Sequence, residues 1–178
     1  INNDGEIRNI RFSGSVNSTR AVGGLIGVNT GSITTARVSG SVTGIENVGG
    51  LVGDNDGGTI RVATASVSVT ASGDAGSAGG LVGFNGGAIQ NTSAFGRVQT
   101  TFDGGGLVGT QAGSIRDSFA AGAVTATTDD ASVGGLIGFN DGIFIQDSYF
   151  DQRATNQSVA ATNPSNLPPG LNLTTAQM

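Results

Sequence analysis

The sequence predicts an all-β chain folded as a parallel β-solenoid (β-helix) of about six coils with an extended C-terminal tail. The first observation is the motif Gly-Gly-Leu-(Ile/Val)-Gly, which occurs five times with its leucines 26, 30, 26 and 29 residues apart. Repeats of this length are typical of stacked solenoids. The second observation is an isoleucine eight or nine residues after each leucine, followed by alternating apolar and polar residues. That alternation, rich in β-branched residues, favours strands over helices.

The repeated apolar residues are the predicted anchors of the core. They are Leu25, Leu51, Leu81, Leu107 and Leu136, together with Ile33, Ile60, Ile89, Ile115 and Ile145. The residue after each leucine is always isoleucine or valine, and a stripe of exposed aliphatic side chains is unusual on a soluble protein. We therefore expect this second column to be buried as well, either by a bend at the glycines or by a covering layer.

An amide side chain stands four residues after each leucine. These predicted stacking amides are Asn29, Asn55, Asn85, Gln111 and Asn140. An amide repeated at one position of a solenoid can hydrogen-bond to its copies above and below, and asparagine also tolerates left-handed turns. The repeated glycines are expected at coil corners, where glycine allows positive φ angles and close backbone approach.

The repeats occupy residues 1–151, and the periodicity stops there. Two of the intervals between repeats are longer than the others and rich in small polar residues, which predicts loops at 70–78 and 125–133. Residues 152–178 carry all three prolines and are expected to form an extended capping or linker segment. Such a segment would protect the open strand edges at the end of the stack.

The composition excludes several chemistries. The 178 residues include no cysteine, no histidine and no lysine, which rules out thiol catalysis and the commonest general base and metal ligand. No run of about 18 apolar residues occurs, so we expect no membrane insertion. The net charge is −5, and the eight arginines lie scattered along the sequence. We therefore expect no basic stripe and no nucleic-acid partner.

Acidic residues suggest two candidate sites, each with a plain structural alternative. Asp54 and Asp56 lie in an Asp-Asn-Asp-Gly segment and supply oxygen ligands of the kind that calcium prefers, whereas a tight turn is the structural interpretation. Asp117 and Asp147 share one position in consecutive coils. Two carboxylates about 5 Å apart suit retaining glycoside hydrolysis, whereas a polar surface column is the alternative. We expect no catalytic residues and no cofactor, with calcium as the one metal considered.

The repeat resembles the GLUG-motif repeat of bacterial exported proteins. The similarity rests on Gly-Leu-(Ile/Val)-Gly, then asparagine, glycine and isoleucine, then a strand ending in Gly-x-Val, as at Gly79–Asn85, Gly87, Ile89 and Gly96–Val98. It covers nearly the whole chain. The resemblance implies a large secreted or surface-anchored protein, a class that includes adhesin-like proteins and immunoglobulin A-cleaving metallopeptidases. The zinc motif of those peptidases, His-Glu-x-x-His, does not occur in a chain without histidine.

The expected function is a non-catalytic structural or adhesive module that acts as a rigid stalk or fibre subunit. We expect it to be exported to the extracellular space or cell surface. Its predicted partners are a protein or glycan on a host or neighbouring cell, with end-to-end self-association as a further prediction. The alternatives are a glycan-binding or carbohydrate-active β-helix and a docking module of a large surface protease. An exposed aromatic platform would favour glycan binding; Phe84 and Phe139 share a column but are separated by Thr110.

Overall fold

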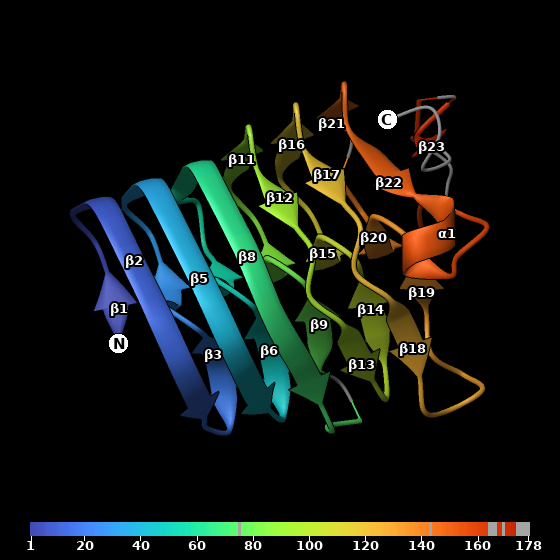
Figure 1. The fold of residues 1–178 in the computed structure, drawn as a ribbon, viewed down its shortest axis with the longest axis horizontal. Coiled ribbons are helices and arrows are strands. Elements are labelled where there is room, and N and C mark those ends of the chain that lie inside the picture. Colours follow the sequence, from blue (N-terminus) through green and yellow to red (C-terminus); the bar gives the residue numbers. More distant parts are fainter. Residues whose placement is uncertain (75, 143, 164–166, 169, 174–178) are drawn as a thin grey trace.

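A computed structural model describes residues 1–74, 76–142, 144–163, 167–168 and 170–173. The described chain is nearly all β, and its coils stack side by side from the N-terminal to the C-terminal end (Figure 1). Each coil passes through three parallel sheets, named A, B and C here, of six, twelve and five strands. The five strands of sheet C mark five complete turns. The predicted parallel β-solenoid is therefore confirmed.

The strands of the three sheets alternate along the chain. Sheet A contains β1 (Asn2–Asn3), β4 (Ile26–Asn29), β7 (Val52–Asn55), β10 (Val82–Asn85), β15 (Val108–Gln111) and β20 (Ile137–Asn140). Sheet B contains β2 (Glu6–Asn17), β5 (Ser32–Gly44), β8 (Thr59–Ala71), β11 (Ala88–Gln90), β12 (Ser93–Ala94), β13 (Val98–Thr100), β16 (Ser114–Arg116), β17 (Phe119–Ala120), β18 (Val124–Ala126), β21 (Phe144–Gln146), β22 (Tyr149–Asp151) and β23 (Asn172–Leu173). Sheet C contains β3 (Arg20–Gly23), β6 (Glu46–Gly49), β9 (Ser77–Gly79), β14 (Asp103–Gly105) and β19 (Val133–Gly134). The one helix among the described residues is α1 (Gln152–Thr155).

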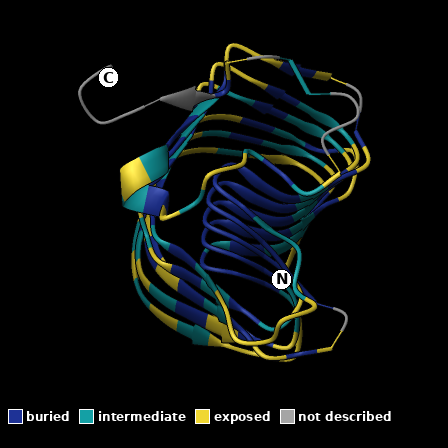
Figure 2. Ribbon diagram, turned by 90° about the vertical axis from the view of Figure 1, so that its right-hand side faces the viewer, coloured by how far each residue is buried: buried dark blue, intermediate teal, exposed yellow. Residues whose placement is uncertain are grey.

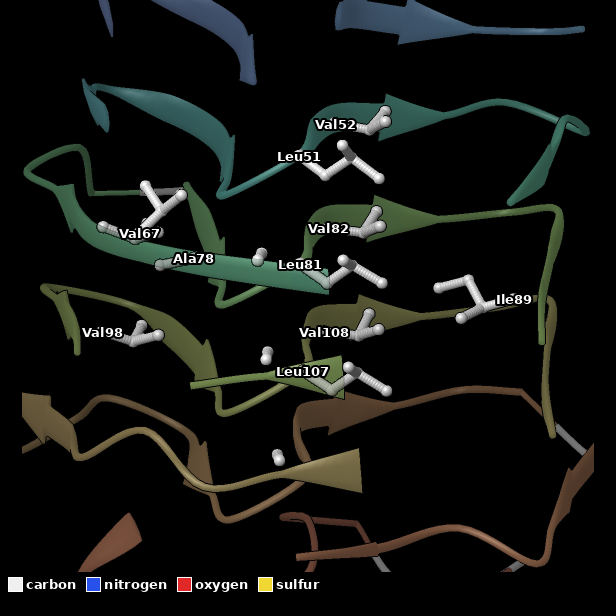
Figure 3. Close-up of a cluster of buried hydrophobic side chains, with 14 of the residues drawn as sticks. Leu51, Val52, Val67, Ala78, Leu81, Val82, Ile89, Val98, Leu107 and Val108 are labelled. Carbon is white, nitrogen blue, oxygen red and sulfur yellow. The ribbon is translucent and has the colours of Figure 1, made fainter. Parts of the chain in front are cut away.

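The core consists of apolar columns that run along the solenoid axis. Leucines and valines of successive coils stack on one another inside the turns (Figure 3). Leu51, Leu81, Leu107 and Leu136 are fully buried, whereas Leu25, in the first full coil, is only partly buried. Viewed along the axis, the buried residues line the inside of the coils and the exposed residues lie on the outer rim (Figure 2). Each coil therefore depends on its neighbours for a complete core.

The column after the leucines is buried because the chain bends, not because a second layer covers it. The backbone N–H groups of Leu51 and Val52 both donate to the carbonyl oxygen of Leu81, at 2.8 and 3.1 Å. Two consecutive N–H groups that share one acceptor cannot belong to a regular strand, so the chain turns at the leucine and sheet A begins at the next residue. Both side chains consequently enter the core, and each is 0% exposed.

The repeat glycines are required by close approach of neighbouring coils. A Cβ on Gly49 would overlap the carbonyl oxygen of Val52, and a Cβ on Gly50 would overlap that of Gly80 in the next coil. Positive φ, the other expected reason, applies to Gly57, six residues after Leu51, but to none of the described glycines of the Gly-Gly-Leu-(Ile/Val)-Gly motif itself. Steric room, rather than left-handed backbone, explains why the motif is glycine-rich.

Left-handed backbone occurs instead at a bend in sheet B, two residues after each isoleucine anchor. The residues there are Asn9 (φ 54°), Thr35 (58°), Val62 (53°), Asn91 (53°), Asp117 (50°) and Asp147 (46°). The bend shifts the inward alternation by one residue, so that Ile33 and Ala36 both face the core. Asparagine and aspartate tolerate this conformation, whereas β-branched residues are outliers in it.

Among the passages from one sheet to another, the longest run from sheet B to sheet C. Residues 72–76 join β8 to β9, and residues 127–132 join β18 to β19. In the first full coil a single residue, Ile45, makes the same passage from β5 to β6. The predicted loops at 70–78 and 125–133 therefore fall on one corner of the stack, with residue 75 outside the described part.

The C-terminal segment follows the last coil and pairs with it. Leu136 and Ile137 donate their backbone N–H groups to Ala160 O, at 3.1 and 2.9 Å, so Ala160 stands where the leucine of a further coil would stand. Further on, β23 pairs with β22. The segment was predicted to be extended, but it begins with α1, because the Asp151 carboxylate accepts from the N–H groups of Arg153 and Ala154. Residues 164–166, 169 and 174–178 of this predicted segment lie outside the described residues.

The two ends of the stack differ. The C-terminal edge is covered in part by the segment just described, whereas β1, β2 and β3 form the N-terminal edges of sheets A, B and C. A hollow of about 430 Å³ opens at that end, lined in part by Ile1, Phe12 and Leu25. In the part of the chain that the structure describes, no helix has the length and apolar character needed to cross a membrane.

Candidate functional site

Sheet B gathers most of the positive charge of the chain on its outer surface, which we call the B face. The exposed arginines in or beside its strands are Arg8, Arg11, Arg37, Arg61, Arg97 and Arg116. The exposed acidic residues of the same face are Glu6, Asp117 and Asp147. The inference from sequence that the arginines form no basic stripe is therefore wrong, because residues far apart in sequence return to the same face in successive coils. The absence of a nucleic-acid partner stays a prediction.

Two columns of side chains on the B face follow from the strand register. The first runs Arg8, Thr34, Arg61, Gln90, Arg116 and Gln146. The second runs Arg11, Arg37, Thr64, Ser93, Phe119 and Tyr149. Neighbours in a column are one strand spacing apart, about 4.8 Å. The left-handed bend lies between the two columns, so the B face has two adjoining strips.

Most of these arginines have no ionic partner in the described chain. The two ion pairs found there join Arg8 to Glu6 and Arg20 to Glu46, and Arg20 belongs to sheet C. Arg116 lies over the ring of Phe144, with 5.1 Å from its guanidinium carbon to the ring centroid, which is a cation–π contact. The positive charges of Arg11 and Arg37 are thus available to an anion from outside.

A shallow depression of about 280 Å³ marks the start of the second column. It is lined by Arg11, Arg37, Val38, Ser39, Thr64 and Ser66. Arg11 and Arg37 are direct register partners, and like charges placed opposite each other on neighbouring strands destabilise a sheet. The depression therefore combines two guanidinium groups that repel each other with hydroxyl groups that can donate or accept hydrogen bonds.

The second column changes from cationic to aromatic along the axis. Ser93 Oγ donates to Thr64 Oγ1 at 3.3 Å, and Phe119 follows Ser93 in register. Phe119 packs against Phe95 with ring centroids 6.1 Å apart and ring planes tilted by 58°. Phe95 is 49% exposed, so part of this aromatic pair faces solvent. The B face thus offers charge, hydroxyls and aromatic rings in sequence along one line.

A ladder of amide hydrogen bonds stiffens the opposite part of each coil, in sheet A. Asn3 donates to Asn29, Asn29 to Asn55, and Asn55 to Asn85, each at 2.7 Å between Nδ2 and Oδ1. Asn85 donates to Gln111 Oε1 at 2.8 Å. Asn3 was missed from the sequence because its coil has no Gly-Gly-Leu motif; its position four residues before Ile7, like Asn29 before Ile33, was the available signal.

The ladder stops before the last predicted amide. Asn140 is the register partner of Gln111 and is 1% exposed. However, neither of its side-chain amide atoms has a hydrogen-bond partner among the described residues, and neither does Gln111 Nε2. Among the described residues, Asn140 therefore does not take part in the predicted ladder of stacked amides. Gln111 is one methylene longer than the asparagines before it, which displaces its amide from the line of the ladder.

The acidic residues considered as sites lie in separate places. Burial raises the pKa of the Asp54 carboxyl, and the neighbouring negative charge of Asp56 raises this pKa further. Within the described ranges, no three acidic side chains converge as a group that could hold a metal ion, and calcium binding stays a prediction. Asp117 and Asp147 lie at the left-handed bend of consecutive coils. Aspartate tolerates left-handed backbone, so the bend alone explains why aspartate stands at both positions.

One further acid, Asp103, is buried in a small polar cluster between sheets C and A. Thr110 Oγ1 donates to Asp103 Oδ2 at 2.9 Å, and Thr110 Oγ1 also lies 2.6 Å from Ser77 Oγ. Burial raises the pKa of the Asp103 carboxyl, although the hydrogen bonds from Thr110 and Ser132 act in the opposite direction. The side chains of this cluster are hydroxyl groups and one carboxylate.

The first column of the B face can be read from the sequence, because Arg8, Arg61 and Arg116 each follow an isoleucine anchor directly. The second column was missed, although Arg11 and Arg37 each stand four residues after an anchor. Equal offsets from an anchor predict equal positions on the coil, which was the available signal. The predicted aromatic candidates Phe84 and Phe139 lie in sheet A, separated by Thr110 as expected, whereas Phe95 and Phe119 had not been considered.

Comparison with known proteins adds no relative. No protein-family model matches the chain, and neither a curated protein nor a solved structure matches it. The GLUG-type resemblance therefore stays a prediction.

Proposed function

We propose that this chain is a non-catalytic structural and adhesive module of an exported bacterial protein, located outside the cell or on its surface. The single observation that carries the proposal is the collection of six exposed arginines on one face of a stiff solenoid. A solenoid with a continuous core and a buried amide ladder holds its outer side chains in fixed positions. Function then resides in the displayed surface rather than in the fold.

The proposal favours a stalk or display module over a subunit of an open-ended fibre. A head-to-tail fibre needs two free ends that complement each other. Here the C-terminal edge already pairs with Ala160 and β23, so a second copy would have to displace this segment.

Adhesion is tested with beads that carry the 178-residue chain, attached through an added C-terminal tag and flowed over animal and bacterial cell layers. The test variant is Arg11→Gln/Arg37→Gln on the B face. The matched control, Arg20→Gln/Arg153→Gln, removes the same charge from sheet C and α1. We expect retention by the native chain and the control, and loss of retention by the B-face variant. Absence of retention on every surface would overturn the adhesive role.

A further inference from the structure

We propose that the B face binds an acidic polysaccharide, a glycan chain bearing carboxylate or sulfate groups, laid along the solenoid axis. This inference rests on the proposed function and names its ligand class. Anionic groups occupy the depression at Arg11 and Arg37, and sugar rings lie over Phe119, further along the same column, and over Phe95, which packs beside Phe119.

Arg11 and Arg37 together favour the binding of an anion. Arg11 and Arg37 are exposed, one strand spacing apart and without an acidic partner in the described chain. A carboxylate or sulfate placed between them removes their mutual repulsion and accepts hydrogen bonds from both guanidinium groups in the geometry that arginine prefers. Ser39, Thr64 and Ser66 line the same depression and can bond to sugar hydroxyls beside the anion.

The length and direction of the column fit a linear polymer. From Arg11 to Tyr149 the register makes five steps between coils, which is about 24 Å at the usual strand spacing. One coil spacing is close to the length of one pyranose residue, so successive sugars meet successive coils. A glycan running along the axis would therefore keep its position relative to the side chains over several residues.

The aromatic end of the column favours sugar over other polyanions. Phe95 exposes half of its surface and Phe119 packs beside it at 6.1 Å, which provides apolar rings for the C–H faces of pyranoses. Double-stranded nucleic acid presents a denser line of negative charge. Ten of the thirteen acidic residues of the chain lie away from the exposed B face, and they would repel a large polyanion that wraps beyond this face.

The test is calorimetric titration of the 178-residue chain at low salt with four probes: polygalacturonate oligosaccharides, chondroitin sulfate oligosaccharides, neutral dextran oligosaccharides and a short DNA duplex. We expect binding to one or both acidic glycans and none to dextran. Polygalacturonate carries only carboxylates, whereas chondroitin sulfate carries carboxylates and sulfates, so binding to chondroitin sulfate alone would mean that sulfate is required. Arg11→Gln/Arg37→Gln should weaken this binding by about tenfold or more, as expected for the loss of charge-assisted hydrogen bonds.

Two controls make the result specific. Arg20→Gln/Arg153→Gln should change the affinity by less than about twofold, because it alters only the long-range charge. Phe95→Ala should weaken glycan binding and leave DNA affinity unchanged. The proposal is overturned by equal losses in the two arginine variants, by dextran binding as tight as acidic-glycan binding, by tighter DNA binding, or by no binding to either acidic glycan. If beads are retained on cells and neither acidic glycan reduces that retention, the adhesive function is supported but the proposed glycan ligand is refuted.

Discussion

Replacing Asn55 by alanine removes the central rung of the amide ladder. Asn55 accepts from Asn29 and donates to Asn85, both at 2.7 Å, and donates to the carbonyl oxygen of Gly58 at 3.0 Å. Each bond contributes about 1 kcal/mol net, so three bonds account for about 3 kcal/mol. The oxygens of Asn85 and Gly58 then lose this donor inside the protein, which raises the expected loss to about 3–5 kcal/mol.

The matched control is Asn140→Ala. Asn140 is as buried as Asn55, but its amide has no partner among the described residues. Its removal deletes the same atoms without breaking a ladder bond and should change stability by about 1 kcal/mol or less, in either direction.

Urea unfolding followed by far-UV circular dichroism measures both variants against the native chain. The ladder account predicts that Asn55→Ala is destabilised by at least about 2 kcal/mol more than Asn140→Ala, with similar slopes against urea. Equal losses at the two positions would refute the reasoning, since they would mean that the amides serve only as packing volume.

Three further predictions concern strain, packing and charge. Val62→Asn should raise the free energy of unfolding by about 1 kcal/mol in urea unfolding, because Val62 is β-branched at φ 53° and asparagine tolerates that conformation. Leu81→Ala should lower it by about 2–5 kcal/mol, since Leu81 is 0% exposed in the central leucine column. Asp103→Asn should be more stable than the native chain at neutral pH, measured by thermal melting across pH, because burial raises the pKa of the Asp103 carboxyl. Protonation of Asp103 stabilises the folded chain fully below the unfolded pKa of 3.8, and this stabilisation is lost as the pH rises through the raised folded pKa. The difference in stability between Asp103→Asn and the native chain should therefore shrink as the pH falls toward 3.8.

Each of these predictions has its own control. Thr43→Asn, at an exposed and extended strand position, should give none of the gain expected at Val62; an equal gain would point to a general effect of asparagine. Leu25→Ala should be milder than Leu81→Ala, since Leu25 is only partly buried, and the reverse order would contradict the assignment of the core. A difference for Asp103→Asn that does not vary with pH would show that ionisation of Asp103 is not its cause.

The sequence predicted the core well because a solenoid repeats its core in every coil. Leu81 and Ile89 belong to periodic columns, and periodicity is visible without coordinates. The bend at Val62 was not predicted, since a left-handed residue has no apolar signature and valine disfavours that conformation. The burial of the column after the leucines was predicted, but its cause was not. The N–H groups of Leu51 and Val52 share one carbonyl acceptor, which shows a bend rather than a covering layer, and this is visible only in the backbone structure.

The candidate binding surface was harder to predict, for a geometric reason. The register offset is 26 residues from Arg11 to Arg37 but 27 from Arg37 to Thr64, so one fixed period does not align the columns. Surface residues also vary from coil to coil, and the column that ends with Phe119 and Tyr149 begins with Arg11 and Arg37. Counting from the isoleucine anchor of each coil, rather than with one fixed period, aligns both columns.

Parallel, in-register stacking of the coils underlies both the amide ladder and the B face, and a disulfide between two neighbouring coils would test it. Ser41 Oγ donates to Ser15 Oγ at 2.9 Å on strands β5 and β2, the strands that also bring Arg37 beside Arg11. The chain has no native cysteine, so Ser15→Cys/Ser41→Cys should oxidise to an intramolecular disulfide, detected by mass and by non-reducing electrophoresis. The control, Ser13→Cys/Ser41→Cys, places the Cα atoms about 8 Å apart, beyond the reach of a disulfide. Efficient closure of the first pair alone is the predicted result, and equal closure of both pairs, or closure of the control alone, would contradict the register on which the ladder and the B face rest.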